Sequence, residues 1–146
     1  MPGVHHTAIC TADVERSMRF WRDGIGLAEV FDQTFTGDWP TLFGAPGTTL
    51  RSIFLGDPQQ PDAGMVELVV FDGAGAAPPR PGGPCHGFFL VSLQRDVEPT
   101  LATLARLGFT QGVRRISVPA PAGKLVPMAV ISAPDDVLVE LIGPPR

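Results

Sequence analysis

Hydrophobic and polar positions recur at the spacing of a β-strand in some segments and at the spacing of a helix in others. The order of these segments in the first half of the chain is repeated in the second half. In the first half, short apolar or alternating runs predict strands, at 4–11, 27–35, 50–57 and 65–71. Between the first two runs, apolar and charged side chains recur at helical spacing after Asp13 and before Gly24. In the second half the pattern predicts a helix over 96–109 and four more strands, at 85–93, 110–119, 124–133 and 137–143.

Both predicted helices have residues suited to their ends and to a buried side. Asp13 can cap the first helix, and Gly24 and Gly26 end it. The residues expected inside are Val14, Met18, Phe20 and Trp21 in the first helix and Leu101, Leu104 and Leu107 in the second. The charged side chains of the first helix fall on its other side and are expected in water.

The two halves therefore share one element order, strand-helix-strand-strand-strand, and some of their letters. "DVERSMRFWRDGIGL" is matched by "DVEPTLATLARLGF", and "MVELVVF" by "VLVELIG". Because one half alone cannot bury both faces of its sheet, we expect the halves to pack together. The prediction is one α+β domain over 1–146, with βαβββ modules at 4–71 and 85–143 and a Gly/Ala/Pro linker at 72–84. The modules are expected to have strongly curled mixed sheets that form an open barrel-like cleft.

Composition narrows the class of protein. Apolar residues make up 44% of the chain and charged residues 18%, which is enough to fill a core. The net charge of −4 and the scattered basic residues argue against nucleic acid as a partner. No apolar run reaches roughly 18 residues and the start lacks a leader pattern, so we expect a cytoplasmic protein without a membrane span. Cys10 and Cys85 lack metal or redox spacing and are expected to be small apolar fillers.

Candidate chemistry comes from equivalent places in the two halves. His6 lies in the first predicted strand of one half and His86 in that of the other, while Glu67 and Glu140 lie in the last strands. If the halves pack around a pseudo-twofold axis, these four side chains converge. Strand alternation puts His6 on one side and His5 on the other, so His5 is expected at the surface or in support of a ligand.

The two glutamates interrupt apolar strands, and no Lys or Arg lies within three residues of either. Burial of an unpaired carboxylate costs on the order of several kcal/mol of folding free energy. One divalent cation bound by both glutamates would offset that cost. Two imidazoles and two carboxylates suit Zn, Ni, Co, Mn or Fe(II), and leave room for water or a substrate. The plainer interpretation also stands: a strand histidine in the core or at an edge, and strand glutamates that face water.

The middle of the chain is rich in aromatic residues that could bind an apolar small molecule. Trp39 and Phe43 lie in a predicted loop bounded by Gly and Pro and are the best candidates to line a pocket, with Phe54 in the next strand. Asp38, beside Trp39, is expected to cap the loop. These residues favour an apolar or ring-bearing ligand.

Two stretches resemble the vicinal oxygen chelate superfamily, which includes glyoxalase I, methylmalonyl-CoA epimerase, extradiol dioxygenases and bleomycin resistance proteins. The first is "HHTAICTADVERSMRFWRDGIGL", with Trp21 where the family usually has Tyr. The second is "APDDVLVELIG", with Asp136 in place of a glycine. The resemblance extends over about 4–143 and implies the same two-module fold.

The resemblance also implies site residues. The family's metal ligands fall on His6, Glu67, His86 and Glu140, and the carboxylate at the place of Glu140 can also act as the catalytic base. The expected reaction is a metal-dependent isomerisation or lyase step, through an enediolate, on a small substrate with vicinal oxygens. Arg51 is a possible clamp for a glutathione carboxylate. The family's habit also implies a homodimer.

Two other functions stay open at this point. A binding protein of the bleomycin-resistance kind would use no metal and would hold a hydrophobic natural product between two subunits. An Fe(II) dioxygenase would use three ligands, but the chain has no tyrosine to match the acid of many extradiol enzymes. An epimerase is disfavoured because the second acidic residue of such enzymes would fall near Leu50, Arg51 and Ser52, and none of these is acidic.

Overall fold

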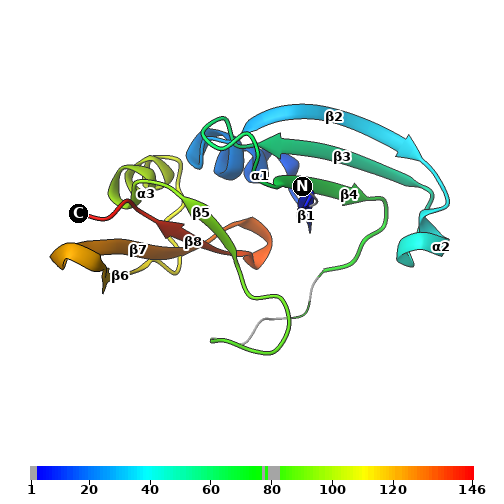
Figure 1. The fold of residues 1–146 in the computed structure, drawn as a ribbon. Coiled ribbons are helices and arrows are strands. Elements are labelled where there is room, and N and C mark those ends of the chain that lie inside the picture. The colour runs from blue at the N-terminus through cyan, green and yellow to red at the C-terminus, as the bar shows by residue number, and fades with distance from the viewer. Residues whose placement is uncertain (1–2, 77, 79–82) are drawn as a thin grey trace. The chain divides into compact units, whose positions relative to one another are not determined.

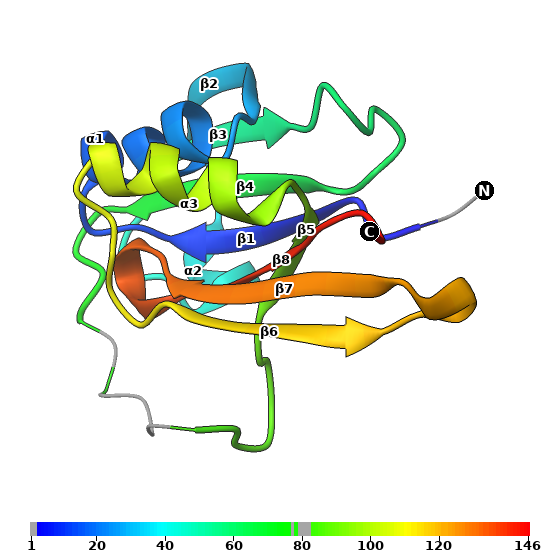
Figure 2. The ribbon, with the colours of Figure 1, turned by 90° about the vertical axis from the view of Figure 1, so that its left-hand side faces the viewer.

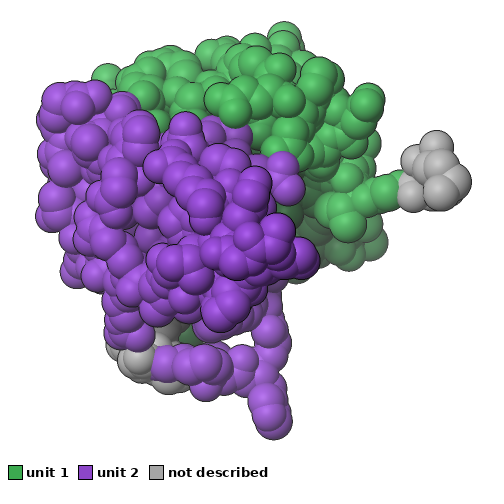
Figure 3. Space-filling view, turned by 60° about the vertical axis from the view of Figure 1, so that its left-hand side comes forward, with its two compact units in different colours: residues 1–78 green, residues 79–146 purple. Residues whose placement is uncertain are grey.

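A computed structural model describes residues 3–76, 78 and 83–146 of the chain. It divides into two compact units, residues 1–78 and residues 79–146, coloured separately in Figure 3. Part of the predicted linker, residues 77 and 79–82, lies outside the described residues.

Unit 1 contains a four-stranded mixed sheet with a helical segment after its first strand (Figure 1). Its elements are β1 (His6–Cys10), α1 (Val14–Met18), η1 (Arg19–Gly24), β2 (Ala28–Thr36), α2 (Trp39–Phe43), β3 (Thr49–Gly56) and β4 (Met65–Phe71). The strand order is β1-β4-β3-β2. The first strand pairs in parallel with β4, and the other pairs are antiparallel.

The predicted first helix is confirmed, and its second half has a wider, π-helical turn. Asp13 Oδ1 accepts a hydrogen bond from the Arg16 backbone N–H at 3.0 Å, which caps α1. In η1 the Ile25 amide donates to the carbonyl of Phe20, five residues earlier, at 2.9 Å. Phe20 and Trp21, adjacent in sequence, are both fully buried. This segment therefore supplies the largest side chains of the unit 1 core.

Unit 2 has the same topology as unit 1. Its elements are β5 (Val91–Gln94), α3 (Val97–Arg106), β6 (Arg114–Pro119), η2 (Pro121–Gly123), β7 (Leu125–Ser132), η3 (Pro134–Asp136) and β8 (Leu138–Ile142). The strand order is β5-β8-β7-β6, and Figure 2 shows β6 and β7 running side by side as an antiparallel pair. Leu101 and Leu104 of α3 are buried as predicted, whereas Leu107 is only half-buried.

Three details differ from the predictions. The loop around Trp39 contains a short helix, α2, because Asp38 caps it through the Thr41 amide and Gly44 ends it at a positive φ of 66°. The strand predicted over 85–93 begins at Val91, since its partner β8 is short and Val91 already pairs with Val139. Neither sheet is closed or strongly curled over the described residues, so the strongly curled, barrel-like form expected for them is incorrect.

The turn before β8 has an unusual backbone. Asp135 and Asp136 adopt φ values of 62° and 56°, in the left-handed region that favours glycine. Asp136 stands where the family that this stretch resembles has a glycine. The turn keeps the left-handed conformation although the residue there carries a side chain.

Candidate metal site

Unit 1 brings His6 and Glu67 together, because β1 and β4 are neighbouring parallel strands. Ala8 pairs with Glu67, and His6 pairs with Met65 two positions earlier. His6 Nε2 lies 3.6 Å from Glu67 Oε1, and the Glu67 side chain is 14% exposed against 36% for His6. Within β1 the side chains alternate, since His6, Ala8 and Cys10 are exposed while Ile9 is buried on the other face.

The face of the unit 1 sheet that carries Glu67 is the one away from α1. Phe54 on β3 lies directly opposite Glu67 and shares its face, whereas the next residue, Ile53, points to the other side. Ile53 borders the same hollow as Val14 and Met18 of α1, so that other side is the helix-covered one. Glu67 is therefore half-buried on the face that α1 does not cover.

Ser52 holds one oxygen of the Glu67 carboxylate. Its hydroxyl donates to Glu67 Oε2 at 2.5 Å, and the serine is only 2% exposed. The sequence alone gives no sign of this role for Ser52. The role depends on the register of β3 against β4, which places Ser52 opposite Val69 and on the same face as Glu67.

His5 lies on the same side as His6, contrary to the alternation argument. His5 Nδ1 and His6 Nδ1 are 2.7 Å apart, at hydrogen-bond distance. His5 precedes β1, so the strict alternation of strand side chains does not apply to it. Both imidazoles meet the ring of Phe54 edge-on, with centroid distances of 6.0 and 4.9 Å.

Aromatic side chains extend along this face. Phe31 lies against Phe54 with ring centroids 4.8 Å apart. On α2 the rings of Trp39 and Phe43 stack at 5.9 Å, and Phe43 meets Phe71 of β4 at 5.8 Å. Phe43 is 59% exposed and so is available to a ligand. The structure thus places Phe54 beside the His6–Glu67 pair, and Trp39 and Phe43 against the end of β4.

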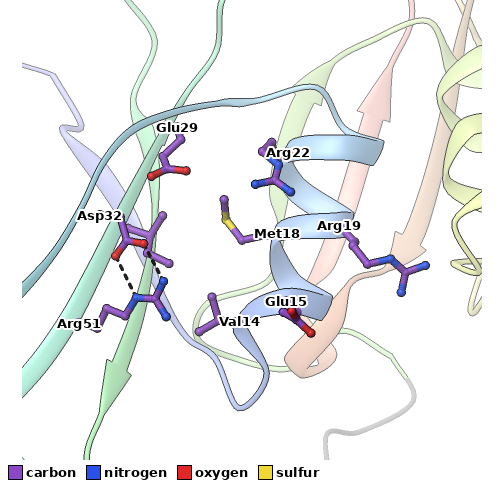
Figure 4. Close-up of a pocket in the computed structure, with 9 residues that line it drawn as sticks. Val14, Glu15, Met18, Arg19, Arg22, Glu29, Asp32 and Arg51 are labelled. Atoms are coloured by element: carbon purple, nitrogen blue, oxygen red, sulfur yellow. Dashed lines mark hydrogen bonds and ion pairs between the residues drawn. The ribbon is translucent and has the colours of Figure 1, made fainter.

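Arg51 lies on the opposite face of the sheet from Glu67. It pairs in register with Val70, three residues along β4 from Glu67, and an odd separation puts side chains on opposite faces of a sheet. Its guanidinium donates two hydrogen bonds to Asp32, at 2.9 and 2.6 Å, which lower the pKa of Asp32 and raise that of Arg51. Figure 4 shows this pair facing Arg22 and Met18 across a hollow of 420 Å³. Within unit 1, then, Arg51 is not brought to the candidate ligands.

In unit 2, Glu140 has a setting similar to that of Glu67. It lies on β8 between the fully buried Val139 and Leu141 and is itself half-buried. Ser92, directly opposite on β5, donates to Glu140 Oε1 at 2.8 Å. Each candidate carboxylate therefore accepts a serine hydroxyl from a neighbouring strand.

His86 does not occupy the place in unit 2 that His6 occupies in unit 1. Ser92 faces Glu140 as Ala8 faces Glu67, so the counterpart of His6, two residues before Ala8, is Leu90. His86 is exposed and lies outside β5, which begins at Val91. The prediction that His86 stands on the first strand of the second half is thus incorrect.

The donor atoms of unit 1 fit half of a metal site. Two ligands of one tetrahedral cation, each about 2.1 Å from it, lie about 3.4 Å apart, close to the 3.6 Å between His6 Nε2 and Glu67 Oε1. Within either unit alone, the described residues bring no three His, Cys, Asp or Glu side chains together as a metal site.

The chain contains two βαβββ units, and in each unit the last strand in chain order carries a candidate carboxylate. This arrangement defines a duplicated α+β protein. The family model of the Glyoxalase/Bleomycin resistance protein/Dioxygenase superfamily matches residues 3–141, and the chain belongs to this superfamily. This is the vicinal oxygen chelate superfamily that the sequence resembles, so the prediction of the family is confirmed.

Known proteins show the same relationship. A lactoylglutathione lyase-like protein, terB, of Aspergillus terreus is 31% identical over 97% of this chain and 75% of its own length. A glyoxalase family protein from Bacillus cereus has a TM-score of 0.68 at 14% identity, over 96% of this chain and 91% of its own. The trypanothione-dependent glyoxalase I of Leishmania major has a TM-score of 0.61 at 18% identity, over 98% and 87%. The two structures support the fold alone.

None of the helices in the described part of the chain is long and apolar enough to cross a bilayer.

Proposed function

We propose that the protein is a divalent-metal-dependent isomerase or lyase of the glyoxalase type, acting on a small apolar or aromatic substrate with vicinal oxygens. The observation that carries this proposal is the His6–Glu67 pair, whose facing atoms have the spacing of two ligands of one cation. The family of the chain and its lactoylglutathione lyase-like relative support the same type of chemistry.

The proposed ligands are His6 and Glu67 of unit 1 and Glu140 of unit 2, with a position left for substrate or water. Zn, Ni, Co, Mn and Fe(II) suit this mixture of imidazole and carboxylate. We leave His86 out of the set, because it precedes β5 and Leu90 takes the place that corresponds to His6. Three protein ligands with an open position are typical of a catalytic site.

The metal would supply polarisation of the two substrate oxygens, which makes the C–H bond beside them acidic. Glu140 is the proposed base as well as a proposed ligand: Ser92 holds its Oε1, so Oε2 is the atom that would bind the ion at rest and would leave it to take the proton. Isomerisation is complete when Glu140 returns this proton to the adjacent carbon and the hydroxyl proton passes to the former carbonyl oxygen. Phe54 and Phe31 provide an apolar surface beside His6 and Glu67.

Hydrogen exchange into a model substrate tests this proposal. 2-Hydroxyacetophenone has an aromatic ring, vicinal oxygens and an acidic C–H. In D₂O the protein loaded with Co²⁺, Ni²⁺ or Zn²⁺ should catalyse deuterium uptake at that carbon, followed by NMR. Glu140→Gln should abolish the uptake and His86→Ala should retain it. Equal uptake with the wild type and with Glu140→Gln would show that Glu140 is not the base.

A metal-free binding protein is the second candidate function. Glu67 and Glu140 already accept hydrogen bonds from serine hydroxyls, and His86 lies outside β5. Both features are compatible with a site that holds no metal. This function predicts no binding of divalent ions and tight binding of an aromatic natural product, reported by quenching of Trp39. An Fe(II) dioxygenase would instead consume O₂ during turnover, which an oxygen electrode detects.

The protein is also proposed to be a homodimer. The edge strands β2 and β6 are exposed along their whole lengths, and both carry large apolar side chains, such as Phe31 and Ile116. Light scattering after gel filtration should give twice the 15.5 kDa mass of the chain.

A further inference from the structure

We propose that His5 and Ser52 are positioning residues, which orient His6 and Glu67 so that one atom of each faces a shared divalent ion. This inference rests on the proposed metal site. Metal-binding histidines and carboxylates generally need such outer hydrogen bonds to fix their tautomer and direction. Unit 1 supplies one for each of its two candidate ligands.

The first contact places one proton between the two imidazoles, and the proposal assigns that proton to His6. Two imidazole nitrogens 2.7 Å apart need one N–H and one lone pair between them. When His6 Nδ1–H donates to His5 Nδ1, the lone pair of His6 Nε2 is free on the side of Glu67. The 3.6 Å from Nε2 to Glu67 Oε1 is too long for a direct hydrogen bond, which agrees with an Nε2 that carries no proton.

The second contact selects the free oxygen of Glu67. An ionised carboxylate only accepts hydrogen bonds, so the Ser52 hydroxyl is the donor. Because Ser52 is almost fully buried on β3, its Oγ has little freedom to move. It occupies Oε2 and leaves Oε1 as the atom that faces His6.

Phe54 holds the two imidazole rings in place. The edges of His5 and His6 both meet its ring, and Phe54 itself is buried and directly opposite Glu67. The imidazoles are thus restrained by packing as well as by their mutual hydrogen bond. The four side chains His5, His6, Ser52 and Glu67 form a prearranged half-site whose outward atoms are Nε2 and Oε1.

Cobalt binding to variants of the full chain tests the proposal. Ser52→Ala removes the donor to Glu67, and His5→Phe keeps a ring against Phe54 but removes the acceptor for His6. Each should weaken Co²⁺ binding by about 10- to 100-fold, measured by competition with a chelator, and change the visible spectrum of bound Co²⁺. Ser52→Thr and His5→Gln keep a donor and an acceptor and should restore most of the affinity.

Ser17→Ala is the matched control. Ser17 is also a buried hydroxyl, bonded to Thr11 at 2.6 Å, but it lies in α1, away from these ligands. It should lower stability without changing Co²⁺ affinity. If the wild type binds Co²⁺ and both Ser52→Ala and His5→Phe keep its affinity and spectrum, the positioning roles are overturned and the metal site stands. If the wild type binds no Co²⁺, the proposed site and this inference both fail.

Discussion

Asp136 sits at a backbone conformation that costs a residue with a side chain more than it costs glycine. Its φ is 56°, it is exposed, and it lies in the turn that leads into β8. The left-handed region brings Cβ close to the following carbonyl oxygen, whereas glycine has no Cβ. Val137, which follows the turn, and Val139 in β8 are both buried and anchor the chain after Asp136.

Asp136→Gly should therefore raise the free energy of unfolding by about 1 kcal/mol. Urea unfolding of the variant and the wild type measures the difference. Asp136→Ala is the matched control and should lower stability, since alanine tolerates positive φ less well than aspartate. An Asp136→Gly variant that is less stable than the wild type would show that the aspartate side chain stabilises this turn.

Other single residues show where prediction from sequence stops. The caps formed by Asp13 and Asp38 follow from local rules, and the structure confirms both. Ser52 could not be predicted, because its partner is 15 residues away and is defined only by the register of two strands. His5 was predicted on the wrong side because it lies just before the strand whose alternation was applied to it.

At the scale of elements, an ion pair joins the edge strand β2 to β3. Asp32 and Arg51 are diagonal neighbours, since Asp32 pairs with Ile53 and Arg51 pairs with Thr34. Their two hydrogen bonds lower the pKa of Asp32 in the folded chain below its ordinary value of 3.8. The folded state thus binds fewer protons than the unfolded state, and stability from this pair rises with pH.

The pair should stabilise the protein fully above about pH 4 and lose its effect as the pH falls through the lowered pKa of Asp32. Both side chains are about one-third exposed or more, so the contribution is about 0.2–1 kcal/mol. Arg51→Met should reduce the stability at pH 7 by this amount and flatten its decline toward pH 3, measured by urea unfolding. Asp32→Asn should do the same, and the double variant should be no worse than either single one. Additive effects of the two changes would contradict the pairing.

Most elements could be predicted because their periodicity is strong. The strand at 65–71 has the observed bounds of β4, and the strand at 50–57 differs from β3 by one residue at each end. Two elements were mispredicted for physical reasons. α2 is too short for a helical period to show, and β5 begins late because the short β8 offers no partner for the residues before Leu90.

At the scale of the whole molecule, the internal repeat was the most informative feature of the sequence. It predicted two βαβββ units, and both are present with the same strand order. The repeat of letters did not, however, guarantee that each candidate side chain lies at the corresponding place in both units. Glu67 and Glu140 lie on corresponding strands and each accepts a serine hydroxyl, but Leu90 and not His86 stands where His6 has its counterpart. Sequence position did not predict the place of His86, because the chain changes direction at Gly87, which has a φ of 112°, and β5 is short.

The metal content of protein purified without chelators tests the central claim most directly. The wild type should hold about one divalent ion per chain, as an open catalytic site does. His6→Ala and Glu140→Ala should each lose it, while His86→Ala, changed outside the proposed ligand set, should keep it. Circular dichroism of each variant confirms that it is folded. Full metal content in both His6→Ala and Glu140→Ala, or its loss in His86→Ala alone, would contradict the account.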